Sequence, residues 1–125
     1  MSDFDAGMKT RREVLGDEHV DRAAAAAGSF GAPWQEFITW YAWGGVWSRP
    51  GLDRRTRSAI TLAALVSLRA ENEVGMHVRA ALRNGLTVEE INEIFIHTAV
   101  YAGVPASNSA LAIARKVLEE EGAID

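Results

Sequence analysis

The stretch that decides the fold of this 125-residue chain is residues 71–108, ENEVGMHVRAALRNGLTVEEINEIFIHTAVYAGVPASN. On both sides of Asn84-Gly85, apolar residues recur every three or four positions, which is the spacing of one face of an α-helix. Asn-Gly favours a left-handed helix end, and Thr87-Val-Glu-Glu90 has the pattern of a capping box that starts a helix. The stretch therefore predicts two amphipathic helices, at about 72–83 and 88–102, with a short turn between them.

Each of these two helices has an apolar face that we expect to be buried. The residues predicted to point inward are Val74, Val78, Ala81 and Leu82 on the first helix, and Ile91, Ile94, Phe95 and Thr98 on the second. Gly103-Val-Pro105 ends the second helix, because proline cannot continue a helix but fits the first turn of a new one. A last amphipathic helix is expected to follow, to about Leu118.

Cap and turn residues predict four more helices earlier in the chain. They are residues 3–15 with Gly16 as the cap, 17–27 up to Gly28, an aromatic helix with Pro33 in its first turn and its end at Gly44–Gly45, and a helix from Asp53 to about Arg69. No segment alternates with the period of a β-strand. We therefore expect an all-α fold of about seven helices in a single domain, residues 1–125.

Two of the expected helices have more apolar surface than a small core needs. Trp34, Phe37, Trp40 and Tyr41 share one face, which predicts either a core stripe or a subunit interface. The segment AITLAALVSL, residues 59–68, is apolar on nearly every side. It predicts a helix that is buried on all sides, either at the centre of a bundle or at a subunit interface. Both features favour a homo-oligomer over a monomer.

Composition narrows the classes of function. With 48% hydrophobic and 24% charged residues the chain is globular, and its net charge of −4 argues against a nucleic-acid partner. No apolar run approaches the ~20 residues that span a membrane, and the start MSDFDAGMKTRRE has no secretory leader, so we expect a cytoplasmic protein. The absence of cysteine excludes disulfides, thiolate nucleophiles and cysteine-based metal or redox sites.

The first candidate for chemistry is the pair Glu73 and His77, which lie one helical turn apart. A carboxylate beside an imidazole can fix one tautomer of the ring and raise its basicity, as a general acid or base requires. The same spacing also suits an ordinary surface salt bridge. A metal site is not expected, because no third ligand follows at a recognisable spacing.

For each of the other polar candidates, two interpretations stay open. His97 and Tyr101 form a second pair at this spacing, and a hydrogen-bonded histidine in the core is the alternative to a substrate contact. Arginine outnumbers lysine eleven to two, which reflects either codon usage or guanidinium groups that clamp carboxylates. Arg49 stands near Trp47 on a Pro-Gly turn, where it either presents a cation at the mouth of a pocket or forms a cation–π pair.

Three stretches in unbroken order carry a resemblance to a known family: DAGMKTRREVLGDEHVDRA, YAWGGVWSRPGLDRRTRSAITLAAL and HVRAALRNGLTVEEINEIFIHTAVYAGVPASNSA. They resemble the carboxymuconolactone decarboxylase family of the alkylhydroperoxidase D-like superfamily, over about residues 4–118. The peroxidase branch of that superfamily has a Cys-x-x-Cys-x-x-x-His motif. Placing its histidine on His77 puts Ala70 and Glu73 at the cysteine positions, so the resemblance implies no thiol redox chemistry here.

The resemblance implies an all-helical fold and a step in protocatechuate degradation, within the β-ketoadipate pathway. In this step 4-carboxymuconolactone, a small lactone carboxylate, loses CO2 and becomes β-ketoadipate enol-lactone. No cofactor is expected, because the electrons left by CO2 can delocalise through the ring double bond into the lactone carbonyl. The resemblance also implies a homo-oligomer, a trimer or a hexamer.

Within this resemblance we hypothesise that His77 donates the proton to carbon and that Glu73 sets its tautomer and charge. The candidates for substrate binding are Arg49 and Arg12 for the carboxylate, Trp43 and Trp47 for the exclusion of water, and His97 and Tyr101. Two other functions stay open. One is decarboxylation or a related reaction of another lactone or keto acid by a non-thiol member of the superfamily. The other is a non-catalytic helical oligomer or ligand-binding subunit.

Overall fold

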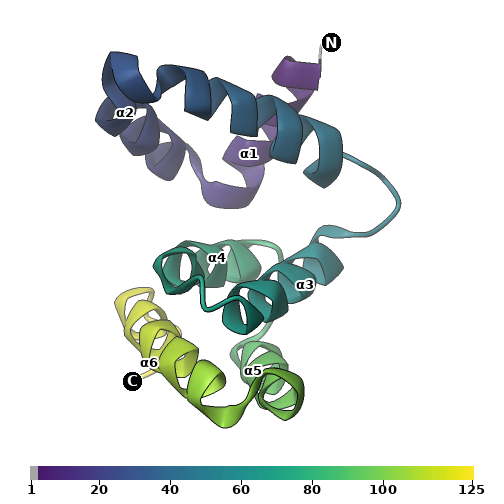
Figure 1. The fold of residues 1–125 in the computed structure, drawn as a ribbon, viewed down its shortest axis with the longest axis vertical. Helices are drawn as coiled ribbons and strands as arrows, with labels where there is room; N and C mark the ends of the chain where they lie inside the picture. The colour runs from purple at the N-terminus through teal and green to yellow at the C-terminus, as the bar shows by residue number, and fades with distance from the viewer. Residues whose placement is uncertain (1–2) are drawn as a thin grey trace. The chain divides into compact units, whose positions relative to one another are not determined.

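The structure, a computed structural model, describes residues 3–125, and every regular element in them is helical (Figure 1). In chain order the elements are α1 (Asp3–Leu15), α2 (Asp17–Ile38), the π-helical segment η1 (Thr39–Trp47), α3 (Arg54–Ser67), α4 (Glu71–Arg83), α5 (Val88–Ala102) and α6 (Val104–Glu120). The predicted all-α fold of about seven helices is thereby confirmed. No helix among these residues is long and apolar enough to cross a membrane.

The chain divides into two compact units, which are described separately below. The N-terminal unit is Met1–Asp53 and contains α1, α2 and η1, and the C-terminal unit is Arg54–Asp125 and contains α3 to α6. The single domain expected from the sequence stays a prediction.

In the N-terminal unit, α1 packs directly against η1 through two glycines. A Cβ atom on Gly7 would lie 2.7 Å from the backbone nitrogen of Gly44, and a Cβ atom on Gly44 would collide with the carbonyl group of Asp3. The prediction that a helix ends at Gly44–Gly45 is therefore wrong, because η1 continues to Trp47. Gly44 is required for close approach of two backbones, not for a helix end.

Gly28 divides α2 (Asp17–Ile38) into two helical stretches that meet at a kink. Its backbone leaves helical geometry, with φ 59° and ψ −162°, as the predicted stop requires. Pro33 lies in the second stretch. The prediction that one helix stops at Gly28 and another follows it is confirmed, because glycine adopts this conformation at little steric cost.

The C-terminal unit is an arrangement of four helices in which α3 and α4 lie over α5 and α6 (Figure 1). The residues predicted to point inward are confirmed: they are buried, apart from Leu82 and Ile94, which are partly buried against the same core. The helix junctions are confirmed as well. Gly85 ends the turn after α4 with φ 93°, and Thr87 and Glu90 form both hydrogen bonds of the capping box.

The prediction that the helix over residues 59–68 lies at the centre of a bundle is wrong, and the alternative of a subunit interface stays a prediction. Within α3 only Ser58, Leu62 and Val66 are buried, and they are spaced four residues apart on one stripe. Ile60 and Leu68 are exposed, at 53% and 78%. In a unit of four helices, α3 has neighbours on one side only, so the remaining apolar side chains face outward.

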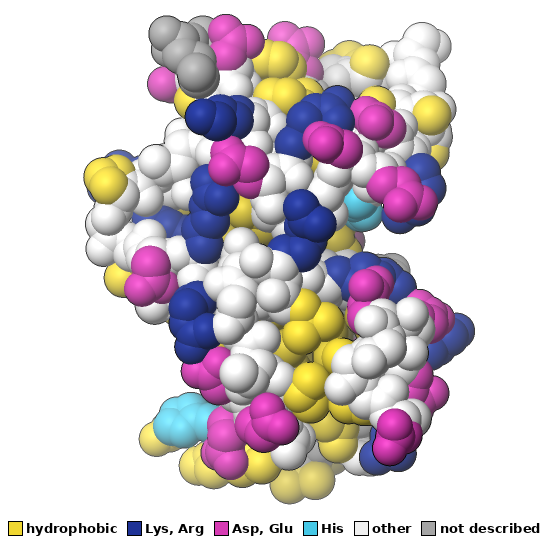
Figure 2. Space-filling model, turned by 180° about the vertical axis from the view of Figure 1, so that it is seen from behind, with side chains coloured by type: hydrophobic (Ala, Val, Ile, Leu, Met, Phe, Trp, Pro, Cys, Tyr) yellow, Lys and Arg dark blue, Asp and Glu magenta, His cyan; other side chains and the backbone are white. Residues whose placement is uncertain are grey.

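Besides those at α3, large apolar side chains are exposed in two further groups. On α2 and η1 they are Phe30, Trp34, Phe37, Trp40 and Tyr41, which we call the aromatic surface. The core alternative for this stripe is therefore wrong, and the interface alternative remains. The second group lies on α5 and the start of α6, where Figure 2 shows hydrophobic side chains gathered at the lower end of the molecule.

Candidate active site

Helix α4 carries the predicted catalytic pair at the edge of its buried stripe. Val74 and Val78 are fully buried and fix the rotation of the helix, which leaves His77 half-buried and Glu73 exposed. The two side chains share a face of α4, and Glu73 lies on its solvent side.

The C-terminal half of α4 is held by hydrogen bonds to other helices of the C-terminal unit. Arg79 donates from Nε to Glu121 at 2.8 Å and from Nη2 to Glu120 at 2.7 Å, and so connects α4 to the end of α6. After the helix, the amide of Asn84 donates to Ser58 Oγ on α3 at 2.8 Å. The position of His77 within its unit is fixed by these contacts and by the apolar core.

His97 and Tyr101 lie on the outer face of α5. Phe95 and Thr98 occupy the inner face, so His97 is exposed and Tyr101 is 81% exposed. The two rings contact each other, with centroids 5.4 Å apart. The alternative of a core histidine is wrong, because the buried stripe of α5 runs through other residues.

The remaining predicted site residues belong to the N-terminal unit. Trp43 is buried, Trp47 is half-buried, and their ring centroids are 5.1 Å apart. Arg49 is exposed on the turn after η1. Arg12 donates hydrogen bonds to Asp17 at 3.1 Å and to Asp21 at 2.9 Å. The bonds to Asp21 and Asp17 raise the pKa of Arg12, so two carboxylates already neutralise this cation.

Sequence reasoning overlooked Arg11, the buried arginine of this unit. Its side chain is 5% exposed, and its guanidinium donates from Nη1 to Thr39 Oγ1 at 3.0 Å and from Nη2 to Gln35 Oε1 at 2.7 Å. Burial lowers the pKa of Arg11, and the adjacent charge of Arg12 lowers it further. A signal was available in the sequence, since Arg11 shares the stripe of Gly7 and Val14 on α1.

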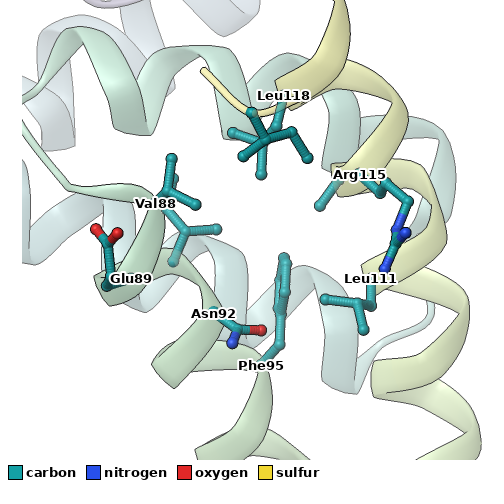
Figure 3. Close-up of a pocket in the computed structure, with 10 residues that line it drawn as sticks. Val88, Glu89, Asn92, Phe95, Leu111, Arg115 and Leu118 are labelled. Atoms are coloured by element: carbon teal, nitrogen blue, oxygen red, sulfur yellow. The ribbon is translucent and has the colours of Figure 1, made fainter. Parts of the chain in front are cut away.

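Each unit has a cavity of its own. In the C-terminal unit a cavity of about 300 Å³ lies between α5 and α6, where Phe95, Leu111 and Leu118 point inward and Arg115 lies at the side (Figure 3). It is mostly apolar and contains none of the predicted catalytic or binding residues. In the N-terminal unit a cavity of about 230 Å³ is lined by α1 and α2 and includes Arg11 and Arg12.

A metal site built from ordinary ligands is not found in the described part of the chain. Residues 3–125 hold no group of three or more His, Cys, Asp or Glu side chains close enough to bind one ion. The residues predicted from the sequence can supply proton transfer by His77, hydrogen bonding by arginine and exclusion of water by tryptophan.

Comparison with known proteins gives a consistent result. Residues 32–116 match the model of the carboxymuconolactone decarboxylase family. The chain is 45% identical over 119 residues to 4-carboxymuconolactone decarboxylase of Acinetobacter baylyi, covering 95% of this chain and 89% of that protein. It is also 45% identical over 117 residues to nitrosuccinic acid decarboxylase of Metarhizium robertsii, covering 94% of this chain and 82% of that protein. Over these lengths and identities, the chain belongs to the carboxymuconolactone decarboxylase family.

Proposed function

We propose that this protein catalyses the decarboxylation of 4-carboxymuconolactone to β-ketoadipate enol-lactone. The observation that carries the proposal is the 45% identity, over 95% of the chain, to the 4-carboxymuconolactone decarboxylase of Acinetobacter baylyi. A shorter match of 51% identity over 41 residues, to a protein of the same name from Pseudomonas putida, supports it. The protein is a carboxy-lyase of aromatic catabolism.

The reaction sets three requirements. When the bond to CO2 breaks, its electron pair passes through the ring double bond to the lactone carbonyl, and a dienolate results. The enzyme has to stabilise this oxyanion, hold the carboxylate that stays on the substrate, and return one proton to carbon. The lactone itself accepts the electrons, so the step needs no change of oxidation state in the protein.

His77 is the proposed proton donor. It is half-buried, and an imidazole titrates close enough to neutral pH to donate a proton there. Glu73, one helical turn away on the same face of α4, is proposed to set the charge of the ring. The substrate-binding roles of Arg12, Arg49, Trp43 and Trp47 stay predictions.

The substitution His77→Gln tests the proton donor. It should lower the turnover number by about 10²–10⁴-fold, because glutamine keeps the approximate size and polarity of the side chain but cannot donate a proton at neutral pH. Turnover is measured by the loss of ultraviolet absorbance of the lactone and by CO2 release. His19→Gln on α2, outside the proposed machinery, is the matched control and should keep wild-type turnover. A His77→Gln protein that unfolds at the wild-type temperature and turns over at the wild-type rate would refute the assignment.

A second substrate has specific support. Nitrosuccinic acid decarboxylase of Metarhizium robertsii is as similar to this chain as the lactone enzyme, at 45% identity. In nitrosuccinic acid, too, the carboxylate beside the nitro group can leave because that group accepts the electrons. Assay of both acids with the purified protein decides between them. Turnover of nitrosuccinic acid at a kcat/KM above that of the lactone would reassign the substrate while keeping the reaction class.

Self-association is proposed as well. The five side chains of the aromatic surface are between 46% and 97% exposed in one chain, more apolar area than monomers usually leave in contact with water. A second copy of this chain is the proposed partner, in the trimer or hexamer expected from the sequence. The cytoplasmic location stays a prediction.

A further inference from the structure

We infer that the cavity between α1 and α2 of the N-terminal unit is a binding site for a small carboxylate, with the guanidinium of Arg11 as its charge partner. The inference concerns the N-terminal unit alone and does not depend on which acid the enzyme decarboxylates.

The first reason is a buried charge for which no ion pair is described within residues 3–125. Arg11 is 5% exposed, and a guanidinium stays protonated even in such surroundings. The two groups that accept its hydrogen bonds, Thr39 Oγ1 and Gln35 Oε1, are neutral. Arg12, the next residue, is exposed to a greater extent and yet bonds to two aspartates. A buried charge is stabilised far better by an ion of opposite sign than by neutral dipoles alone.

The second reason is an unused donor on the same guanidinium. The Nε atom of Arg11 is buried and makes no hydrogen bond within residues 3–125. Each Nη atom uses one hydrogen for its bond to Thr39 or Gln35 and keeps another. Nε–H together with a neighbouring Nη–H forms the planar fork that binds a carboxylate through both of its oxygens.

The third reason is the cavity that Arg11 lines. The cavity of about 230 Å³ includes Arg11, Gln35 and Thr39 among its polar residues, and Ala24 and Ala27 among its apolar ones. These alanines belong to the run 23–27, whose small side chains leave the cavity open. The volume is below the range usual for drug-sized ligands, so the fit is to a small acid with an apolar body.

The lining also favours a singly charged carboxylate over phosphate. Phosphate sites usually gather several cations or backbone N–H groups, whereas here Arg12 is neutralised by Asp17 and Asp21. The exposed carboxylate of Glu36 also lines the cavity and repels anions, a doubly charged one most strongly. One free fork and apolar walls suit one carboxylate group.

A titration of the full-length protein tests the site without any turnover. The probes are benzoate as a small apolar carboxylate, the lactone reaction product, and inorganic phosphate. Binding is followed by calorimetry and by the Nε–H resonance of Arg11 in ¹⁵N spectra, assigned from its loss in Arg11→Lys. We expect benzoate to bind and to shift this resonance, while phosphate binds at least tenfold more weakly.

Substitutions test the charge of Arg11 and the volume of the cavity separately. Arg11→Gln should abolish binding and Arg11→Lys should weaken it at least tenfold, because lysine has no planar fork. Ala27→Leu should abolish binding by filling the cavity with the charge intact, which keeps the test valid if the Arg11 variants do not fold. Glu36→Gln should tighten binding. Arg22→Gln, which removes an exposed arginine paired with Glu18, is the matched control and should bind as the wild type does.

Each result of these titrations either supports or overturns the carboxylate site. If the reaction product competes with benzoate, the site takes the acid of the proposed reaction, and if it does not, the site takes a different small acid; both results support a carboxylate site. No binding of either carboxylate at millimolar concentration would overturn the inference, as would binding that survives both Arg11→Gln and Ala27→Leu. Failure of the lactone assay with benzoate binding intact would overturn the proposed reaction and leave this site standing.

Discussion

Arg11 and Arg12 are adjacent in the chain and have opposite surroundings. Successive residues of a helix point about 100° apart, so Arg11 falls on the buried stripe of α1 while Arg12 turns toward the start of α2. Burial lowers the pKa of Arg11, and hydrogen bonds to Asp21 and Asp17 raise that of Arg12. Arg12, which we expected to bind the substrate carboxylate, is thus already paired with two aspartates. The partners described for Arg11 are neutral.

The lowered pKa of Glu90 predicts that the folded protein loses stability in acid. The backbone N–H of Thr87 is the main reason that the pKa of Glu90 lies below its ordinary value of 4.5, and Arg55 lowers it further. A carboxyl group whose pKa is lower in the folded state stabilises the fold above its unfolded pKa, and this contribution disappears as the pH falls through the folded pKa. Stability should therefore decrease from about pH 5 downward.

The variant Glu90→Gln should lower the urea midpoint at pH 7 and flatten its decline below pH 4.5, because glutamine does not titrate. The midpoint is measured from pH 3 to pH 7. Glu93→Gln, exposed on the same helix, is the control and should follow the wild-type curve. The assignment is wrong if Glu90→Gln retains the full acid dependence of the wild type.

Among the elements, η1 shows most clearly how packing overrides local signals. Gly44 and Gly45 look like a helix end in the sequence, yet the π-helical segment passes through both. α1 lies so close to η1 that only glycine fits at Gly7 and Gly44. Ser48 reinforces the contact. Its hydroxyl donates to the carbonyl oxygen of Trp43, and its Oγ atom lies 2.8 Å from Oγ1 of Thr10 on α1.

The substitution Gly44→Ala should destabilise the protein by about 1–3 kcal/mol, because the added methyl group collides with the carbonyl of Asp3 and forces α1 away. Gly45→Ala is a matched control one residue later, where the nearest atom to the new Cβ is 3.6 Å away, at ordinary contact distance. Chemical denaturation gives both free energies of unfolding. Equal effects of the two substitutions would show that helix propensity, not close packing, determines the cost.

The junction of α4 and α5 is the opposite case, because local signals determine it. Gly85 adopts the positive φ that the Asn-Gly pair predicts, and Thr87 with Glu90 forms the capping box. Arg55 from α3 then adds contacts that the sequence does not reveal, to the carbonyl oxygen of Gly85 and to Glu90 Oε2. The turn is encoded by its own residues, and the neighbouring helix strengthens it.

At the scale of the whole molecule, the exposed apolar side chains determine which oligomeric state we expect in solution. Phe30 is 97% exposed and Trp34 61%, and the ring planes of Phe37 and Tyr41 are stacked at 7° with centroids 5.4 Å apart. An ordered aromatic surface of this kind is typical of a protein–protein interface. Self-association would remove it from water.

The substitutions Trp34→Ser and Phe37→Ser should each raise the dissociation constant of the assembly by about 30-fold or more, the usual effect of removing a central aromatic side chain that contributes about 2 kcal/mol. Sedimentation equilibrium measures this constant. Lys116→Ser, exposed on α6, serves as the control and should leave it unchanged. A wild-type protein that stays monomeric at tens of micromolar would disprove the proposed interface.

The sequence by itself determined the helices of residues 71–120, their buried faces, the capping box and the family. These features depend on residues within one or two turns of each other, and apolar periodicity, caps and glycines act at that range. The spacing of Glu73 and His77 was equally readable, and so was their place beside the stripe of Val74 and Val78.

Only the tertiary structure decided which faces have neighbours. It showed that α3 is buried along one stripe, that His97 lies outside, that Gly44 serves a close contact and that Arg11 is enclosed. The reason is physical: the burial of a side chain depends on elements far away in the chain, and nothing within one helical turn records their position. An arginine on a mostly apolar stripe looks the same in sequence whether its charge faces solvent or lies against a neighbouring helix.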